Sequence, residues 1–187
     1  MNDHRSWTYD ELVAAEHSNM PLDFVLFWGH TPPKLGEIGP HVFSQWWPHD
    51  FEEDRVAYPT AEHYMMAEKA RLFEDDEALE QVLAAGSPGA AKSAGRRVRG
   101  FTDELWKQHR MNIVVRASTL KFGSDDVMRQ FLLGTGSQVL VEASPVDAIW
   151  GIGMAKDDPA AQTPSQWKGL NLLGFALMQA RAALAQA

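Results

Sequence analysis

A long helical pattern in the middle of the chain constrains the fold most strongly. Residues 102–122 place apolar and aromatic side chains at the three- and four-residue spacing of one helix face, and the pattern stops at Gly123. The side chains that carry this pattern are Leu105, Trp106, His109, Ile113 and Leu120. A continuous helix of this length predicts a mainly helical fold.

Other helices with recognisable start and stop signals are expected on both sides of it. A capping box at residues 8–11, in which a threonine and a glutamate bond to each other's backbone, opens a short N-terminal helix. Side chains of the N-cap type before helical patterns, and glycines after them, predict the others. These other helices open at Thr60 and Ser87 or span residues 75–85, 124–133 and 170–185.

Three short apolar runs are the candidate strands. Residues 24–28 and 55–58 are rich in β-branched and aromatic residues, and we expect them to pair with each other beside the functional site. Residues 138–143 form a third candidate strand. The predicted fold class is mainly α, a compact single domain with a small β element near the N-terminal part of the site.

Composition narrows the classes of protein that fit. The 187-residue chain has the size of one domain, and no linker or repeat divides it. Its net charge of −8 argues against a tight nonspecific nucleic-acid binder, which needs a broad basic surface. The lack of cysteine excludes disulfides and thiolate metal sites, and the histidines have no zinc-protease spacing. Without a signal-like N-terminus or a membrane-spanning apolar run, we expect a soluble cytoplasmic protein with no metal and no cofactor.

The helix that opens at Thr60 carries a pair of side chains suited to acid–base chemistry. Glu62 lies in its first turn, where the positive end of the helix dipole favours a carboxylate, and Lys69 follows two turns later on the same face. In one interpretation Glu62 supplements the cap and Lys69 extends to water. In the other, neighbouring methionine and aromatic side chains desolvate Lys69 and lower its pKa, which makes it a nucleophile or acid–base group. The spacing alone leaves both open.

A second candidate segment, residues 147–153, follows the strand at 138–143. Asp147 offers another carboxylate, and Trp150 offers a ring that can stack on a base or sugar. Gly151 and Gly153 provide a backbone that a ligand can approach closely. The alternative interpretation is an ordinary turn with a core tryptophan. The segment is not a dinucleotide-binding fingerprint, because the third glycine and the helix opened by the glycines are missing.

Taken in order, these segments resemble the NADAR or YbiA-like family. The matching motifs are Thr-Ala-Glu-His-Tyr with a following Ala-Glu-Lys (residues 60–69), Leu-Lys-Phe (120–122), Asp-Ala-Ile-Trp-Gly-Ile-Gly (147–153), Gly-Leu-Asn-Leu-Leu-Gly (169–174), Phe43 with Ser44, and Gly95 with Arg96. The resemblance runs from about Phe24 to Arg181. It predicts an N-terminal extension with a short helix at residues 1–23 and a single NADAR/YbiA-like domain at residues 24–187.

The resemblance implies an N-glycosidase that hydrolyses a ribose C1–N bond. Two substrate types are known within the family: ADP-ribose attached to guanine in nucleic acid or nucleoside, and a phosphorylated ribosylamino-pyrimidine intermediate of riboflavin synthesis. We expect the first, with ADP-ribosylated DNA or RNA among its carriers. The riboflavin intermediate is the alternative substrate, and a non-catalytic ADP-ribose-binding module is the alternative function.

The resemblance also assigns roles to residues. It places Glu62, Lys69 and Asp147 at the scissile bond. The binding residues that it implies are Phe43, Ser44, Trp46, Trp47, Arg96, Trp150, Gly151, Gly153 and Asn171. Among these, Trp150 and either Trp46 or Trp47 are expected to stack on the substrate, Arg96 to bind the pyrophosphate in a planar, bidentate fashion, and Asn171 to act as a polar anchor.

Two mechanisms remain open at this point. Cleavage of a C1–N bond builds positive charge on the sugar, which carboxylates stabilise, and a protonated group must help the base to leave. The resemblance suggests that Lys69 attacks C1 of a ring-opened ribose to give a Schiff base, with Glu62 moving the proton. In the alternative, Glu62 or Asp147 activates water directly.

Three positions depart from the family pattern. Gln45 and Trp46 stand where relatives commonly carry Asn-Phe, and Ile152 stands where some carry an aspartate. Leu172 follows Asn171 where some relatives carry an arginine. These departures bear on the choice of substrate more than on the pair of Glu62 and Lys69.

Overall fold

The computed structural model describes residues 4–32, 34 and 36–187 of the chain. Its helices are α1 (Tyr9–His17), α2 (Ala61–Leu72), α3 (Asp76–Leu83), α4 (Pro88–Gly95), α5 (Asp103–Gly123), α6 (Asp126–Gly134) and α7 (Leu172–Gln186). Its strands are β1 (Phe24–Phe27), β2 (Phe51–Glu53), β3 (Val56–Tyr58) and β4 (Val139–Glu142), and short 3₁₀ helices lie at η1 (Pro40–Phe43), η2 (Pro159–Gln162) and η3 (Pro164–Gln166). The expectation of a mainly helical domain with a small β element is confirmed.

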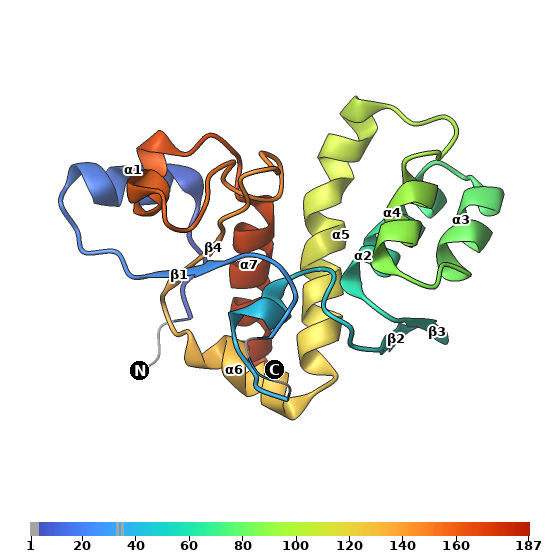
Figure 1. Cartoon of the computed structure of the whole chain (residues 1–187), viewed down its shortest axis with the longest axis horizontal. Coiled ribbons are helices and arrows are strands. Elements are labelled where there is room, and N and C mark those ends of the chain that lie inside the picture. Colours follow the sequence, from blue (N-terminus) through green and yellow to red (C-terminus); the bar gives the residue numbers. More distant parts are fainter. Residues whose placement is uncertain (1–3, 33, 35) are drawn as a thin grey trace.

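The two longest helices occupy the centre of the molecule. α5 and α7 pack against each other, and α5 also packs on α2. In Figure 1, α2, α3 and α4 lie together on one side of α5, while α1 and the paired strands β1 and β4 lie on the opposite side, next to α7. The functional segments predicted from the sequence therefore come from both sides of this central pair.

The predicted helix starts are confirmed. Thr8 and Glu11 form the reciprocal capping box of α1, the Thr60 hydroxyl accepts a bond from the backbone N–H of His63 in α2, and Ser87 caps α4. The ends of α3, α6 and α7 differ by one or two residues from the predicted ranges. At α3 and α6 the cause is that Asp75 and Asp125 act as N-caps, so these helices begin one and two residues after their predicted starts, at Asp76 and Asp126.

The strands exist where the sequence predicts them, but their predicted pairing was wrong. Residues 24–28 do not pair with residues 55–58: β1 runs parallel to β4, with Phe24 opposite Val139, and β2 pairs antiparallel with β3. The two residues between β2 and β3, Asp54 and Arg55, both have positive φ. Such a two-residue turn joins β2 and β3 into a local hairpin. β1 then pairs with the buried β4, which lies far along the chain.

The N-terminal segment is packed onto the rest of the molecule. The indole N–H of Trp7 donates to the carbonyl of Ser137 at 3.0 Å, and Trp7 and Leu12 belong to the main hydrophobic core. Arg181, fully buried in α7, donates to the carbonyls of Arg5 and Gln138 at 2.8 and 2.9 Å. Over the described residues, no helix combines the length and apolar character needed to cross a bilayer.

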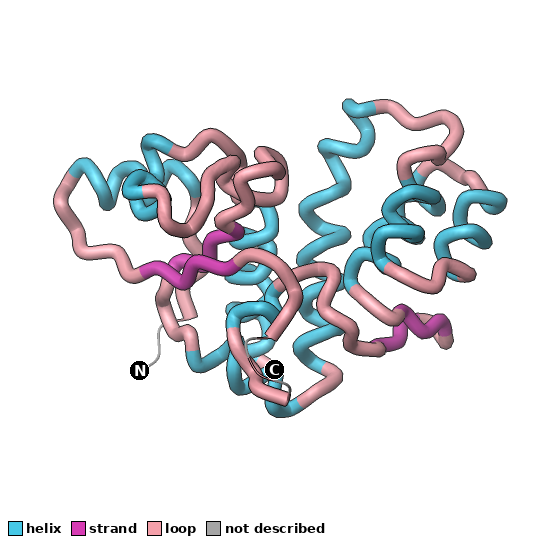
Figure 2. Tube along the Cα trace, in the orientation of Figure 1, coloured by secondary structure: helices cyan, strands magenta, loops and turns pink. Residues whose placement is uncertain are grey.

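The connection from β4 to α7 positions the site. Figure 2 shows that this path runs mostly as loop, and it is interrupted by η2 and η3. Its two ends are tied together by backbone hydrogen bonds, from Leu170 N to the Ala148 carbonyl at 3.0 Å and from Asn171 N to the Gly151 carbonyl at 3.1 Å. The segment around Asp147 is therefore held in a fixed conformation between β4 and α7.

Candidate active site

Several of the predicted site residues meet around one small cavity of about 50 Å³, which we call the acidic cavity. Four separate parts of the chain line it: the segment after η1, the N-terminal part of α2, α4, and the region from β4 to α7. Its lining residues are Ser44, Gln45, Trp46, Glu62, Lys92, Glu142, Asp147, Trp150 and Leu173. A cavity of this size holds a water or two rather than a nucleotide, so it suits the reacting end of a larger substrate.

Glu62 is the most constrained carboxylate of the acidic cavity. Its side chain is only 2% exposed, and its Oε2 accepts a hydrogen bond from the indole N–H of Trp46 at 3.2 Å. Its Oε1 is buried and has no hydrogen-bond partner among the described residues. Burial raises the pKa of Glu62 to about 7, and the charge of Asp147 adds to that rise, while Lys92, the Trp46 bond and Arg96 oppose it. Glu62 can therefore gain or lose a proton near neutral pH.

Glu142 is a second carboxylate of the acidic cavity, partly buried, and it was not among the predicted site residues. It ends β4, and its Oε2 is also buried without a partner within the described part of the chain. Burial raises its pKa to about 8, and the charges of Asp147 and Glu62 add to the rise. A signal was present in the sequence: a carboxylate closing the apolar run 138–143.

Asp147 lines the acidic cavity and also shapes the loop that carries it. Its Oδ1 accepts bonds from the backbone N–H groups of Ile149 and Trp150, both at 2.8 Å. The backbone N–H of Gly153 donates to the Asp147 carbonyl at 3.1 Å. A Cβ on Gly151 would lie 2.7 Å from the Glu142 carbonyl oxygen, so only glycine fits there. Gly151 and Gly153 thus allow the loop to fold tightly and do not line the cavity.

Asn171 holds the end of β4 in place. Its side chain is 0% exposed, and its amide accepts from the backbone N–H of Glu142 and donates to the Leu140 carbonyl, both at 3.0 Å. Its backbone is in the left-handed region, with φ of 51°, which asparagine tolerates better than most residues. Asn171 does not line the acidic cavity, so the structure places it as a support for Glu142 rather than at the predicted position of a substrate anchor.

A buried lysine supports the opposite wall. Lys121 of α5 is 1% exposed and donates to the carbonyls of Val42 and Ser44, at 2.6 and 2.8 Å. Burial lowers its pKa to about 7. The next carbonyl along, that of Gln45, accepts the backbone N–H of Glu62 at 3.0 Å. Lys121 therefore fixes the segment against which the first turn of α2 is bonded.

Lys92 is the amine that faces the acidic cavity, and it too was missed as a site residue. Its Nζ lies 5.9 Å from the ring centroid of Trp46, and its charge lowers the pKa values of both Glu62 and Glu142. α4 reaches this position because Gly95 lets it approach α2: a Cβ there would lie 2.8 Å from the Cγ of Met66. In the sequence, Lys92 stands first in a short basic run that continues with Arg96, Arg97 and Arg99, a pattern that is typical of a solvated surface.

Lys69 lies elsewhere. Its side chain is buried to 9% exposure, its Nζ donates to the Gly95 carbonyl at 2.9 Å, and its ammonium sits 4.1 Å from the ring centroid of Phe101. Burial lowers its pKa, and the charge of Arg96 adds to the effect. Of the two interpretations that the spacing left open, the structure agrees with the one in which neighbouring side chains desolvate Lys69. The amine does not line the acidic cavity, however, because seven residues of α2 separate it from Glu62 by about 10 Å along the helix axis.

The remaining predicted binding residues divide into two groups. Ser44, Trp46 and Trp150 line the acidic cavity. Phe43 lies behind it among core aromatic rings, and Trp47 packs against the ring of His41 at 4.8 Å between centroids. Arg96 is exposed just after α4, one turn beyond Lys92. Over residues 4–32, 34 and 36–187, no group of three or more His, Cys, Asp or Glu side chains is arranged to hold a metal ion.

Comparison with known proteins places this arrangement in a family. Residues 26–185 match the NADAR domain family. The chain is 39% identical over 150 residues to N-glycosidase R617 of Acanthamoeba polyphaga mimivirus. This alignment covers 78% of this chain and 88% of that protein. It is 34% identical over 152 residues to the chloroplastic riboflavin biosynthesis protein PYRR of Zea mays. That alignment covers 75% of this chain and 23% of the Zea mays protein.

The third relative has a known structure. N-glycosidase YbiA of Escherichia coli strain K12 is 32% identical over 139 residues, which covers 74% of this chain and 77% of YbiA. The NMR structure of E. coli YbiA superposes with a TM-score of 0.67 and 26% identity, over 89% of this chain and 88% of that one. Together with the family match, these likenesses identify the chain as a member of the NADAR domain family and an enzyme of the N-glycosidase class.

Proposed function

We propose that this N-glycosidase removes ADP-ribose from guanine bases by hydrolysing the ribose C1–N bond at the acidic cavity. The observation that carries the proposal is the convergence of Glu62, Glu142 and Asp147 on one small space, where two of the three have pKa values raised to about 7 and about 8. Such a site holds negative charge and at least one transferable proton at neutral pH, which are the two requirements of C1–N cleavage.

The bond-breaking step uses both properties. As the C1–N bond breaks, its electron pair goes to the nitrogen of the base, and positive charge develops on the sugar beside the ionised carboxylates. The pair of Glu62 and Glu142 supplies the proton that the leaving nitrogen takes up. Asp147 accepts a proton from the water whose oxygen bonds to C1. Free base and ADP-ribose result, and one water is consumed.

The indole rings at the rim support a ribosylated substrate. Trp46 and Trp150 both line the acidic cavity and come from separate segments, one after η1 and one in the loop after β4. Each ring offers an apolar face to a sugar or base. Arg96, exposed one turn along from Lys92, extends the positive charge away from the cavity, where the pyrophosphate of ADP-ribose would bind.

An amine route through the same cavity would use a different lysine from the one predicted. Lys92 lines the acidic cavity, whereas the Nζ of Lys69 is bonded to the Gly95 carbonyl. Attack of an unprotonated amine on C1 of a ring-opened ribose gives a Schiff base, which borohydride reduces to a stable adduct. Trapping in the wild type that is lost in Lys92→Met and kept in Lys69→Met would assign the amine route to Lys92. The reverse pattern would assign it to Lys69, as the family resemblance suggests, and no trapping supports direct attack by water.

The function is tested with an oligonucleotide that is ADP-ribosylated on guanine. We expect the wild type to release free ADP-ribose and restore the base, as measured by chromatography. Asp147→Asn should lose this activity, and Glu80→Gln, which changes an exposed carboxylate on α3, should retain it. Failure of the wild type to release ADP-ribose would contradict the proposed substrate.

A second substrate is favoured by one comparison. The match to a riboflavin biosynthesis protein supports a phosphorylated ribosylamino-pyrimidine as the alternative, since it too presents a ribose C1–N bond and a phosphate. Release of ribose 5-phosphate from that compound, faster than release of ADP-ribose from the oligonucleotide, would assign the chain to this substrate.

A further inference from the structure

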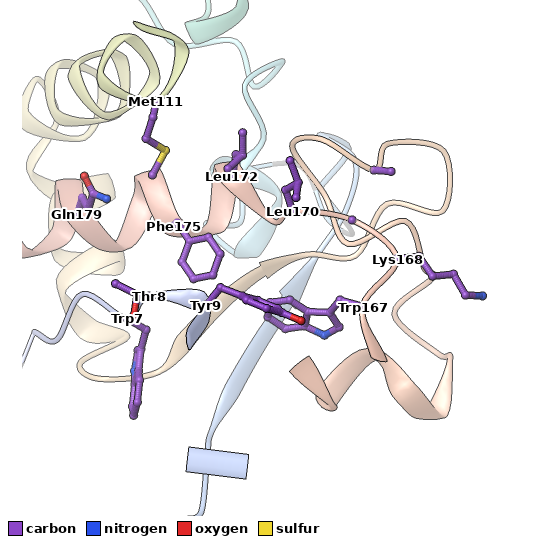
Figure 3. Close-up of a pocket in the computed structure, with 12 residues that line it drawn as sticks. Trp7, Thr8, Tyr9, Met111, Trp167, Lys168, Leu170, Leu172, Phe175 and Gln179 are labelled. Atoms are coloured by element: carbon purple, nitrogen blue, oxygen red, sulfur yellow. The ribbon is translucent and has the colours of Figure 1, made fainter. Parts of the chain in front are cut away.

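A much larger cavity lies against the same loop, and the catalytic steps above do not use it. It has a volume of about 600 Å³, within the range of about 300–1,000 Å³ typical of small-molecule sites. We call it the aromatic cavity. Figure 3 shows the rings and aliphatic chains from several elements that line it, among them Trp7, Tyr9, Met111, Trp167, Leu170 and Phe175.

One wall of the aromatic cavity comes from outside the family match. Trp7, Thr8 and Tyr9 belong to the N-terminal segment, whereas the NADAR match begins at residue 26. This wall is anchored: Trp7 donates to the Ser137 carbonyl, and the carboxylate of Glu16 accepts bonds from the backbone N–H and the hydroxyl of Ser165 at 2.9 and 2.6 Å. The rings of Tyr9 and Trp167 therefore face each other in a fixed arrangement, with 6.5 Å between their centroids.

The two cavities share a thin partition. Asp147 lines the acidic cavity and the next residue, Ala148, lines the aromatic one. In α7 the same alternation occurs, with Leu173 on the acidic side and Leu172 on the aromatic side. The backbone bond from Leu170 to Ala148 closes the partition. The two cavities therefore lie back to back on the two faces of this wall, one residue apart along the chain at Asp147 and Ala148 and again at Leu172 and Leu173.

The lining of the aromatic cavity selects the chemistry of an occupant. Aromatic and aliphatic side chains dominate, and the polar side chains are those of Thr8, Lys168 and Gln179. Figure 3 shows the Lys168 side chain extending away from the rings, and none of the described lining residues is a carboxylate or an arginine. Such a lining suits an uncharged planar ring and does not suit a phosphate, whose cationic partners lie on the α4 side.

We propose that the aromatic cavity binds a purine ring of the ribosylated substrate, which makes the N-terminal segment a determinant of specificity. The proposal rests on the proposed function, which supplies a substrate with two purines: the adenine of ADP-ribose and the guanine that leaves. Both have the chemistry that the cavity recognises, and the experiment separates them.

Two substitutions probe the cavity without altering the acidic one. Tyr9→Ala removes a ring that is 43% exposed, and Leu170→Trp adds bulk to a residue that is 51% exposed, so neither should prevent folding. Val127→Trp, at a residue 61% exposed on α6, is the matched control for added bulk. Thermal melts of all variants check that they fold.

Binding of guanosine, ADP-ribose and ribose 5-phosphate is measured by isothermal titration calorimetry. We expect at least one purine probe to bind the wild type and to bind about tenfold more weakly in Leu170→Trp and Tyr9→Ala, with ribose 5-phosphate unaffected. The purine probe whose Kd changes identifies the ring that occupies the cavity. In turnover, KM for the ADP-ribosylated oligonucleotide should rise by a similar factor with kcat unchanged.

Two results would overturn the proposal: no purine probe binds the wild type, or the cavity variants bind the purine probes as the wild type and Val127→Trp do. Failure of the proposed function has a different signature. In that case the wild type releases no ADP-ribose, yet purine binding is present and is lost in the cavity variants, which would leave a purine site that serves another substrate.

Discussion

The acidic and aromatic cavities lie on either side of one loop and differ in almost every property. The acidic cavity measures about 50 Å³ and gathers three carboxylates and a lysine, whereas the aromatic cavity measures about 600 Å³ and is lined mainly by rings and aliphatic chains. The first is built wholly within the matched NADAR region, and the second takes one wall from the segment before it. The larger volume of the aromatic cavity suits recognition of a substrate group, whereas the carboxylates and the lysine of the acidic cavity suit the reaction itself.

The two cavities should also contribute differently to the stability of the fold. The acidic cavity keeps two carboxylate oxygens, on Glu62 and Glu142, buried and without partners among the described residues, and burial of that kind lowers the stability of the fold when the groups are charged. The aromatic cavity buries apolar surface, which favours folding. A site that is unfavourable for folding but retained in the structure is typical of catalytic centres.

Removing a carboxylate from the acidic cavity should have the largest effect. Glu62→Gln keeps the size of the side chain and the bond from Trp46 but cannot transfer a proton, so kcat should fall by about 10²–10⁴-fold. Steady-state release of ADP-ribose measures it, with Glu80→Gln as the control. A loss of less than about tenfold would remove Glu62 from the reaction.

Loosening the partition between the cavities should cost stability next. Asn171→Ala removes the bonds to Glu142 N and the Leu140 carbonyl and leaves both backbone groups buried without that partner. We expect a loss of about 2–4 kcal/mol in the free energy of unfolding by urea denaturation. Asn112→Ala, an exposed position on α5, should be close to neutral. Equal stability of the two variants would show that Asn171 does not support the partition.

The pH dependence of kcat and of purine binding also distinguishes the two cavities. The reaction needs one proton on the pair of Glu62 and Glu142, whose pKa values are raised to about 7 and about 8. The rate kcat should therefore fall about tenfold per pH unit above pH 8, where both are ionised. Guanosine binding, which involves no titrating side chain of the acidic cavity, should stay constant from pH 6 to 9. A rate that keeps rising above pH 8 would contradict the need for this proton.

The last effect has the opposite sign, because it is a gain in stability. The pKa of Glu62 is higher in the folded protein than its ordinary value of 4.5, so the folded state binds this proton more tightly than the unfolded chain does. That stabilisation is present below pH 4.5 and is lost as the pH rises through about 7. Glu62→Gln should thus be more stable than the wild type by about 3 kcal/mol at pH 8 and by less than about 1 kcal/mol at pH 5. Thermal melts at both values check the sign, and Leu170→Trp should show no such pH dependence.

Local signals in the sequence predicted the helices well. The capping residues Thr8, Thr60 and Ser87 start helices where expected, because a cap depends only on its own next three residues. The pairing of β1 with β4 was not predicted, since it joins segments more than a hundred residues apart and depends on the burial of both. Periodicity correctly placed Glu62 and Lys69 on one helix but carried no information on what faces each of them.

The site was predicted in part for the same reason. Glu62, Asp147, Ser44, Trp46 and Trp150 were expected and are brought together. Glu142 and Lys92 were not, because a carboxylate at a strand end or a lysine in a basic run becomes distinctive only when tertiary packing buries it beside other charges. The catalytic and binding roles of all these residues remain predictions, including that of Lys69.

The central claim is that the acidic cavity carries out the reaction and the aromatic cavity binds part of the substrate. Its most direct test is the kinetics of Glu62→Gln and Leu170→Trp on the same ADP-ribosylated oligonucleotide. Both kcat and KM are measured for each variant and for the wild type. The account predicts that Glu62→Gln loses kcat by at least about 100-fold with KM little changed, and that Leu170→Trp raises KM about tenfold with kcat unchanged. Loss of kcat in Leu170→Trp with full activity in Glu62→Gln would contradict it.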